Sequence, residues 1–169
     1  MGENINIMIR EVKQGDEKAL AYIQTESWKA AFAEIVPADL LRKCTELTRA
    51  ENMYAKLLNE NKGNGYILEI DEQAHCIAYW DVSREKDMPS YAEIICIHSL
   101  QDRWHQGYGS QMMEHVLGKI KNTGFEKVML WVFEENTRAI NFYKKHGFSA
   151  NGKRQEALGS FEVMYEKDL

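Results

Sequence analysis

The chain has 169 residues, with 21 basic and 26 acidic side chains and a formal net charge of −5. This length suits a single globular domain over residues 1–169 that buries a substantial core. The acidic balance argues against a general nucleic-acid binder, and the lack of an apolar run of about 18 residues excludes a membrane-spanning helix.

Hydrophobic periodicity divides the first hundred residues into a strand, two or three helices and three further strands. Alternating isoleucines indicate the first strand, and Pro37 suits the first turn of the second helix. The last of these strands is apolar enough for a central, buried position. The predicted elements are a strand over 4–11, helices over 15–32, 37–47 and 50–60, and strands over 66–70, 76–82 and 91–99.

The rest of the chain alternates helices with strands. Apolar residues from Tyr108 to Ile120 fall on one side of a helix, and Gly124 stands where helices commonly end. The predicted elements are helices over 108–123 and 136–146, and strands over 127–133, 148–155 and 161–167. No repeat or linker interrupts them, so the sequence predicts one mixed α/β domain.

Three cysteines, Cys44, Cys76 and Cys96, form an odd and unpatterned set. Such a set is typical of free, buried thiols in a reducing compartment. The first twelve residues lack the cationic start and apolar block of a secretory signal, so a cytoplasmic protein is predicted. Spacings such as C-x-x-C or H-E-x-x-H are missing, and no metal site is predicted.

A phosphate-binding turn is predicted between the strand over 91–99 and the helix that follows. Two glycines at such a turn let the backbone approach a ligand closely, and the unpaired N–H groups of a helix N-terminus favour negative charge. Met112 stands where a dinucleotide fingerprint needs glycine or alanine, and no Gly-Lys-Ser/Thr triplet marks a P-loop. The segment, here called the cradle, is Gln106-Gly107-Tyr108-Gly109-Ser110.

A second motif lies about thirty residues past the cradle. It combines an asparagine at a helix start with Ala-Ile, Phe-Tyr and Gly-Phe pairs; its residues are Asn136, Ala139, Ile140, Phe142, Tyr143, Gly147 and Phe148. With the cradle at this distance upstream, the pattern resembles the GNAT family of N-acetyltransferases, as a bacterial-type single-domain member. The resemblance covers roughly residues 4–168 and is sharp over 91–148. It implies an α/β (α+β) fold with a central mixed, largely antiparallel twisted sheet of six to seven strands and helices on both faces.

The resemblance also implies acetyl-CoA as cosubstrate. The cradle, with His105 before it, would bind the pyrophosphate, mostly through backbone N–H groups. One position departs from the family pattern, because Trp104 stands where Gln or Arg is usual. The pantetheine arm would lie along the strand and the next helix start, at Ile97, His98, Ser99 and Asn136.

The chemistry implied is direct transfer of the acetyl group to a primary amine. An alkyl amine with a pKa near ~10 must lose a proton before it can attack. The resemblance makes Tyr143 the acid that protonates the departing thiolate and Glu93 the base, acting through water. Each has a plainer alternative: an aromatic core residue for Tyr143 and a solvated strand-end charge for Glu93.

Several alternatives stay open in the sequence. Asn136 binds pantetheine, caps its helix, or does both. His98 suits the acceptor site, and His105 is either a charge beside the phosphate or a surface residue. The acceptor is a small-molecule amine or a peptide amine. A non-catalytic acyl-CoA sensor on the same fold is the competing function. The predicted partners are acetyl-CoA and the amine, with no nucleic acid or membrane, and a homodimer is compatible with the sequence.

Overall fold

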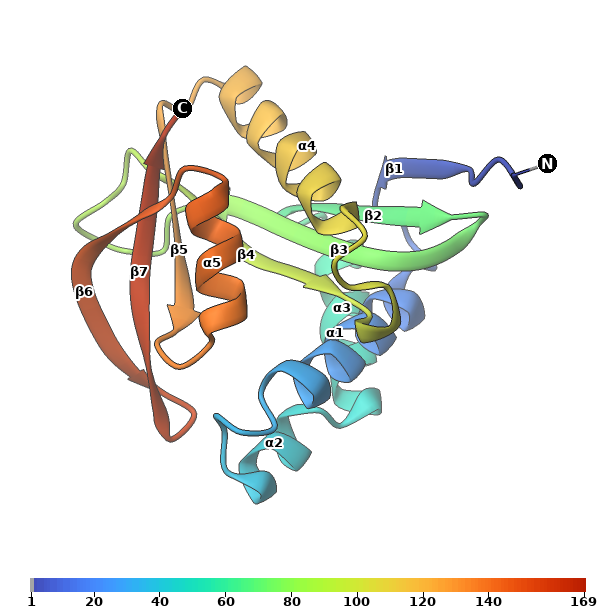
Figure 1. The fold of residues 1–169 in the computed structure, drawn as a ribbon, viewed down its shortest axis with the longest axis horizontal. Helices are drawn as coiled ribbons and strands as arrows, with labels where there is room; N and C mark the ends of the chain where they lie inside the picture. Colours follow the sequence, from blue (N-terminus) through green and yellow to red (C-terminus); the bar gives the residue numbers. More distant parts are fainter. Residues whose placement is uncertain (1) are drawn as a thin grey trace.

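The computed structural model describes residues 2–169, so Met1 of the predicted domain lies outside the described residues. These residues form one seven-stranded sheet and five α-helices (Figure 1). The strand order is β1-β2-β3-β4-β5-β7-β6, and every neighbouring pair is antiparallel except β4 and β5. The bounds are β1 (Ile7–Glu11), α1 (Glu17–Ala31), α2 (Ala38–Cys44), α3 (Leu47–Asn59), β2 (Asn64–Ile70), β3 (Gln73–Val82), β4 (Ala92–Ser99), η1 (Gln101–Arg103), α4 (Tyr108–Thr123), β5 (Lys127–Phe133), α5 (Thr137–Lys145), β6 (Ser149–Ala157) and β7 (Ser160–Asp168).

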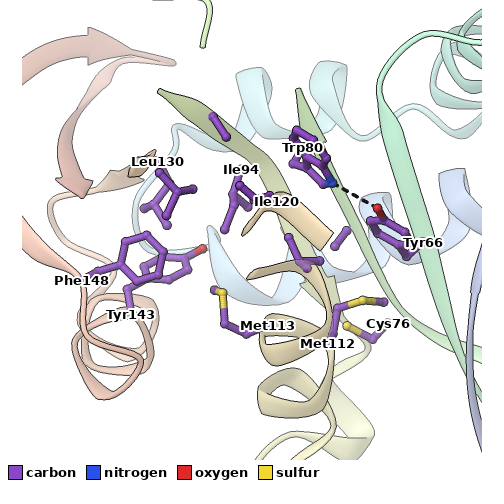
Figure 2. Packing of buried hydrophobic residues seen from close by; sticks show 14 of the residues in the cluster. Tyr66, Cys76, Trp80, Ile94, Met112, Met113, Ile120, Leu130, Tyr143 and Phe148 are labelled. Carbon is purple, nitrogen blue, oxygen red and sulfur yellow. Dashed lines mark hydrogen bonds between the residues drawn. The ribbon is translucent and has the colours of Figure 1, made fainter. Parts of the chain in front are cut away.

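Different helices cover the two faces of the sheet, as the predicted fold class requires (Figure 1). α4 and α5 pack on one face, where Met112, Met113 and Ile120 are fully buried (Figure 2). α1 and α3 pack on the other face, against β2 and β3. The segment that follows α1 reaches the β6–β7 hairpin, so this second face extends from one end of the sheet toward the other.

The parallel strands β4 and β5 diverge soon after they begin to pair. They share only two register partners, Ala92 with Val128 and Glu93 with Met129. On its other edge β4 pairs with β3, where the register shifts around Ile95. An extra residue of this kind bends a strand and increases its twist. β4 and β5 are parallel and pair only near their N-terminal ends, so a gap opens between their C-terminal halves.

Most predicted elements agree with the structure, and β5 has the predicted bounds. The hairpin between β2 and β3 is tighter than predicted: Asp71 and Glu72 form a two-residue turn, both with positive φ, so β3 begins at Gln73. Positive φ at both central residues is the type I′ geometry that suits the strand twist. The short 3₁₀ helix η1 was not predicted, because its polar sequence carries no periodicity.

The described residues also show the helix lengths and the state of the cysteines. Among residues 2–169, none of the helices combines the length and apolar character that a membrane crossing needs. The three cysteines are free thiols; Cys76 is buried as predicted, whereas Cys44 and Cys96 are only partly buried.

Candidate active site

A cavity of about 850 Å³ follows the divergence of β4 and β5. Its lining comes from α1 and α3 on one face of the sheet, from α4 and α5 on the other, and from the β6–β7 hairpin. The cavity therefore joins the two faces. Most of the predicted site residues line it: Ile97, His98, Ser99, His105, Gly107, Tyr108, Gly109, Ser110, Asn136 and Tyr143. Glu93 and Gln106 do not belong to this lining.

The cradle has the backbone geometry of an anion site. His105 and Gly107 have φ values of 64° and 86°, so positive φ recurs at alternate positions. Gly107 is the N-cap of α4, and its carbonyl accepts from the N–H of Gln111 at 3.1 Å. The N–H groups of the intervening residues are the unpaired donors of the helix N-terminus. Gln106 is exposed, so its side chain adds nothing to the cavity wall and only its backbone suits the predicted role.

Cationic side chains surround the same end of the cavity. Arg103, Arg138 and Lys145 all line it. The guanidinium of Arg138 lies 3.5 Å from the ring centroid of Trp104, whose Nε1–H donates to the carbonyl of Ser99 at 3.0 Å. Trp104 thus closes the loop after β4 and supports a cation on its face. Sequence reasoning missed these cations, although Arg138 follows Asn136 by only two residues.

Asn136 caps α5, which bears out one of its two predicted roles. Its Oδ1 accepts from the backbone N–H of Ala139 at 3.2 Å. The residue also lines the cavity. The cap fixes the start of α5, and with it the position of the tyrosine two turns later.

Tyr143 lies on α5 in contact with both the core and the cavity. Figure 2 shows its ring beside Phe148, with the hydroxyl directed away from α5 toward Ile94 of β4. Burial raises the pKa of Tyr143 well above its usual value, and the neighbouring Cys96 thiol adds to the effect. The phenol is therefore neutral at physiological pH and can donate a hydrogen bond into the cavity.

Glu93 is buried, so the plainer alternative of a solvated strand-end charge is wrong. The residue is 1% exposed. Its carboxylate accepts from Arg84 Nη2 at 2.7 Å, from Arg84 Nε at 3.2 Å and from the Arg84 backbone N–H at 3.0 Å. The loop over residues 83–90 folds across β4 and brings Arg84 to Glu93. Nothing in the sequence predicts this pairing.

His98 faces α1 rather than the cradle. Its Nε2 accepts a hydrogen bond from Nε1–H of Trp28 at 3.0 Å. Burial, aided by the charge of Arg138, lowers the pKa of His98 to about 4. The imidazole is therefore neutral and its Nε2 lone pair is already used, which makes His98 a poor base. Its predicted place at the acceptor site stays a prediction.

Within residues 2–169, no group of three or more His, Cys, Asp or Glu side chains is arranged to hold a metal ion.

Comparison with known proteins assigns the family. Residues 26–148, more than half of the chain, match the model of the Acetyltransferase (GNAT) family. The chain belongs to the GNAT family. The predicted resemblance is thereby confirmed, and with it an acetyl-CoA-dependent N-acetyltransferase.

Relatives agree with this assignment at low identity. The chain is 24% identical over 142 residues to the uncharacterized N-acetyltransferase YuaI of Bacillus subtilis, covering 83% of this chain and 79% of that protein. Two solved structures share the fold. PaiA N-acetyltransferase of Thermoplasma acidophilum, solved with coenzyme A, has a TM-score of 0.81 at 18% identity, over 97% of this GNAT chain and 99% of that one. Ribosomal-protein-S18-alanine N-acetyltransferase of Escherichia coli has a TM-score of 0.70 at 17% identity, over 96% and 94%.

The Arg84–Glu93 pair makes a testable contribution to stability. Arg84→Ala leaves a buried carboxylate without its main partner and should lower the free energy of unfolding by about 1–3 kcal/mol. Lys29→Ala, which breaks the exposed pair with Glu26, is the control and should change it by less than about 0.5 kcal/mol. Urea denaturation at pH 7 measures both. Equal effects of the two substitutions would show that the Arg84 pair does not hold its loop.

Proposed function

We propose that the chain transfers the acetyl group of acetyl-CoA directly to a primary amine, with coenzyme A and amine entering from opposite faces of the sheet. The cavity between β4 and β5 supports this, because it joins an anion-binding helix terminus to an aromatic recess on the other face. PaiA of T. acidophilum, whose fold is similar, was solved with coenzyme A. A thioester lying in the gap would be open to attack from the far face.

Coenzyme A is proposed to bind along one continuous path. The pyrophosphate would accept hydrogen bonds from the cradle N–H groups, with Arg103, Arg138 and Lys145 balancing the phosphate charge. The pantetheine arm would follow residues 97–99, where β4 has lost β5 as a partner. Asn136 would contact it from the start of α5.

Direct transfer is favoured over an acetylated cysteine. Cys96 lines the cavity, but burial raises its pKa to about 12. A thiol of this kind is almost entirely protonated at neutral pH, and the thiolate is the nucleophilic form. The amine is therefore the proposed nucleophile, and both substrates must be bound together.

Tyr143 is the proposed acid, in the sense of a hydrogen-bond donor to the departing sulfur rather than a source of a free proton. Its neutral hydroxyl can donate to the thioester sulfur as negative charge develops there. The helix cap at Asn136 and the contact with Phe148 fix the ring before the substrate arrives. Pre-positioning of this kind is needed for a donor that acts only in the transition state.

Glu93 is the proposed base, acting through water. It sits where β4 and β5 are last paired, at the closed end of the gap. Arg84 occupies its carboxylate, so proton transfer requires a water that reaches Glu93 past the guanidinium. An amine that binds already deprotonated would make this step unnecessary.

A non-catalytic acyl-CoA sensor is the second candidate function. It would keep the cradle and the cations but have no use for a buried hydroxyl in the gap. Thiol release from acetyl-CoA over a panel of amines, measured beside thermal stabilisation by coenzyme A, separates the two. Stabilisation without turnover of any amine would favour the sensor.

Replacement of Tyr143 tests the acid role. Tyr143→Phe should lower kcat by roughly 10²-fold or more and leave the KM for acetyl-CoA within about twofold, since the hydroxyl acts in the transition state. Tyr165→Phe is the control, because Tyr165 is a buried tyrosine of the same core cluster outside the cavity lining. Steady-state thiol release gives both constants. An unchanged kcat in Tyr143→Phe would contradict the acid role.

Replacement of Gly109 tests the cradle. A Cβ at Gly109 would lie 3.6 Å from Phe142, which is an ordinary contact, so Gly109→Ala should fold normally. Its methyl group would occupy the space that the phosphate needs and should weaken coenzyme A binding about tenfold or more. Gly118→Ala places the same methyl group in open space on the same helix and should not change the Kd. Titration calorimetry measures the Kd of coenzyme A for each variant. Equal Kd values for Gly109→Ala and Gly118→Ala would place the pyrophosphate elsewhere.

A pH–rate profile tests the base. If Glu93 takes the proton of the bound amine, the acidic limb of the kcat profile should vanish in Glu93→Gln, with kcat lower by roughly 10²-fold at the optimum. The kcat profile is used because protonation of the free amine also shapes kcat/KM. Glu93→Gln keeps the size of the side chain, and urea denaturation checks that the variant folds. Survival of the wild-type acidic limb would mean that the amine loses its proton without Glu93.

A further inference from the structure

The cavity has opposite charges at its two ends. Three of its lining residues are cations, Arg103, Arg138 and Lys145, and all come from the loop before α4 or from α5. Of the Asp and Glu residues in the described part of the chain, Glu162 of β7 alone lines the cavity. The cations suit the phosphates of coenzyme A, which leaves the carboxylate for the other substrate.

Aromatic side chains stand next to this carboxylate. Glu162 is the register partner of Phe133 on β5, and cross-strand partners of this kind point to the same face. The rings of Phe133 and Phe32 meet edge-on, with their centroids 4.9 Å apart, and the ring centroids of Phe32 and Trp28 are 5.3 Å apart. All three rings line the cavity. They form one wall, here called the aromatic wall, where the end of α1 approaches the β6–β7 hairpin (Figure 1).

The other charged groups on this side do not cancel the carboxylate. Arg84 is held by the buried Glu93, and Glu85 accepts from the Trp131 Nε1–H at 3.1 Å. Glu162 itself accepts only from the neutral amide of Gln155. Nearby on β6, Lys153 is paired with Asp87 and Arg154 with Glu134. Each of these cations therefore already has its own carboxylate partner, and none of them forms a salt bridge with Glu162.

We infer that the amine acceptor is an arylalkylamine: a monoamine whose ammonium is drawn to Glu162 and whose aromatic body packs on the wall formed by Trp28, Phe32 and Phe133. This inference rests on the proposed function. Aromatic pairs prefer edge-to-face and offset contacts, which the rings of this wall offer to a planar ligand. A polyamine or an aminoglycoside carries several cations, and the cavity lining offers one carboxylate to receive them. A monoamine matches that single charge.

Binding is tested first, without turnover. Calorimetric titration of the coenzyme A complex with 2-phenylethylamine should show saturable binding, tighter by at least about fivefold than that of hexylamine, which has the same charge but no ring. Spermidine should bind more weakly than 2-phenylethylamine. The coenzyme A complex is used because it cannot react, so the result does not depend on catalysis.

The role of Glu162 is tested by a matched pair of substitutions. Glu162→Gln should raise the KM for 2-phenylethylamine about tenfold or more, with the KM for acetyl-CoA unchanged, because the lost charge faces only the amine. Glu156→Gln removes an equal charge from an exposed position on β6 outside the cavity lining and should leave both constants unchanged. Urea denaturation confirms that both variants fold.

The outcomes separate this inference from the proposed function. Acetylation of spermidine, an aminoglycoside or a peptide N-terminus in preference to 2-phenylethylamine would overturn the inference and leave the acetyltransferase function intact. Equal kinetics for Glu162→Gln and Glu156→Gln would do the same. If arylalkylamines bind the coenzyme A complex but no amine is acetylated, the proposed function fails, whereas the assignment of this site to arylalkylamines stands.

Discussion

The early end of pairing between β4 and β5 is the constraint on which the site depends. A sheet normally pairs the backbone groups of each central strand on both edges, and a buried N–H or C=O without a partner is costly. Here the two parallel strands share only the register partners Ala92–Val128 and Glu93–Met129, and β4 bends around Ile95. The rest of the inner edge of β4 has no strand partner. An extended chain with amide groups, such as the pantetheine arm, can replace the missing strand there.

Two sources of positive charge converge on one side of this gap. The N-terminus of α4 directs unpaired N–H groups at the cavity, and the side chain of Arg138, supported on the ring of Trp104, reaches the same region. Trp104 stands where Gln or Arg is usual in the family. Its ring instead supports the guanidinium of Arg138, so a cation is still present at this position. On the far face the charge is reversed around Glu162. Opposite charges at the two ends of the cavity would separate the proposed binding sites of an anionic cosubstrate and a cationic amine without a further structural element.

The sequence predicted those parts of the site that local chemistry specifies. The cradle and the capped start of α5 could be located because glycine at positive φ and asparagine at an N-cap are read from a few neighbouring residues. Contacts between distant segments could not be located from the sequence. The pairing of Arg84 with Glu93 depends on how the loop over residues 83–90 folds across β4, and the approach of Phe32 to Phe133 depends on two elements a hundred residues apart. Such contacts leave no periodic signal, so the Arg84 partner of Glu93 and the aromatic wall were both missed.

The raised pKa of Tyr143 limits what its hydroxyl can do in the reaction. A thiolate leaving group has a pKa of roughly 8–9, so full proton transfer from a phenol whose pKa lies above ~10 would be uphill. Donation of a hydrogen bond to the sulfur carries no such cost and becomes stronger as charge accumulates, because the surroundings are apolar. The proton released by the amine can then reach the thiolate at a later stage or leave through solvent. Burial of Tyr143 is therefore better suited to stabilising the transition state than to supplying a free proton, and its placement by the α5 cap matters more than its acidity.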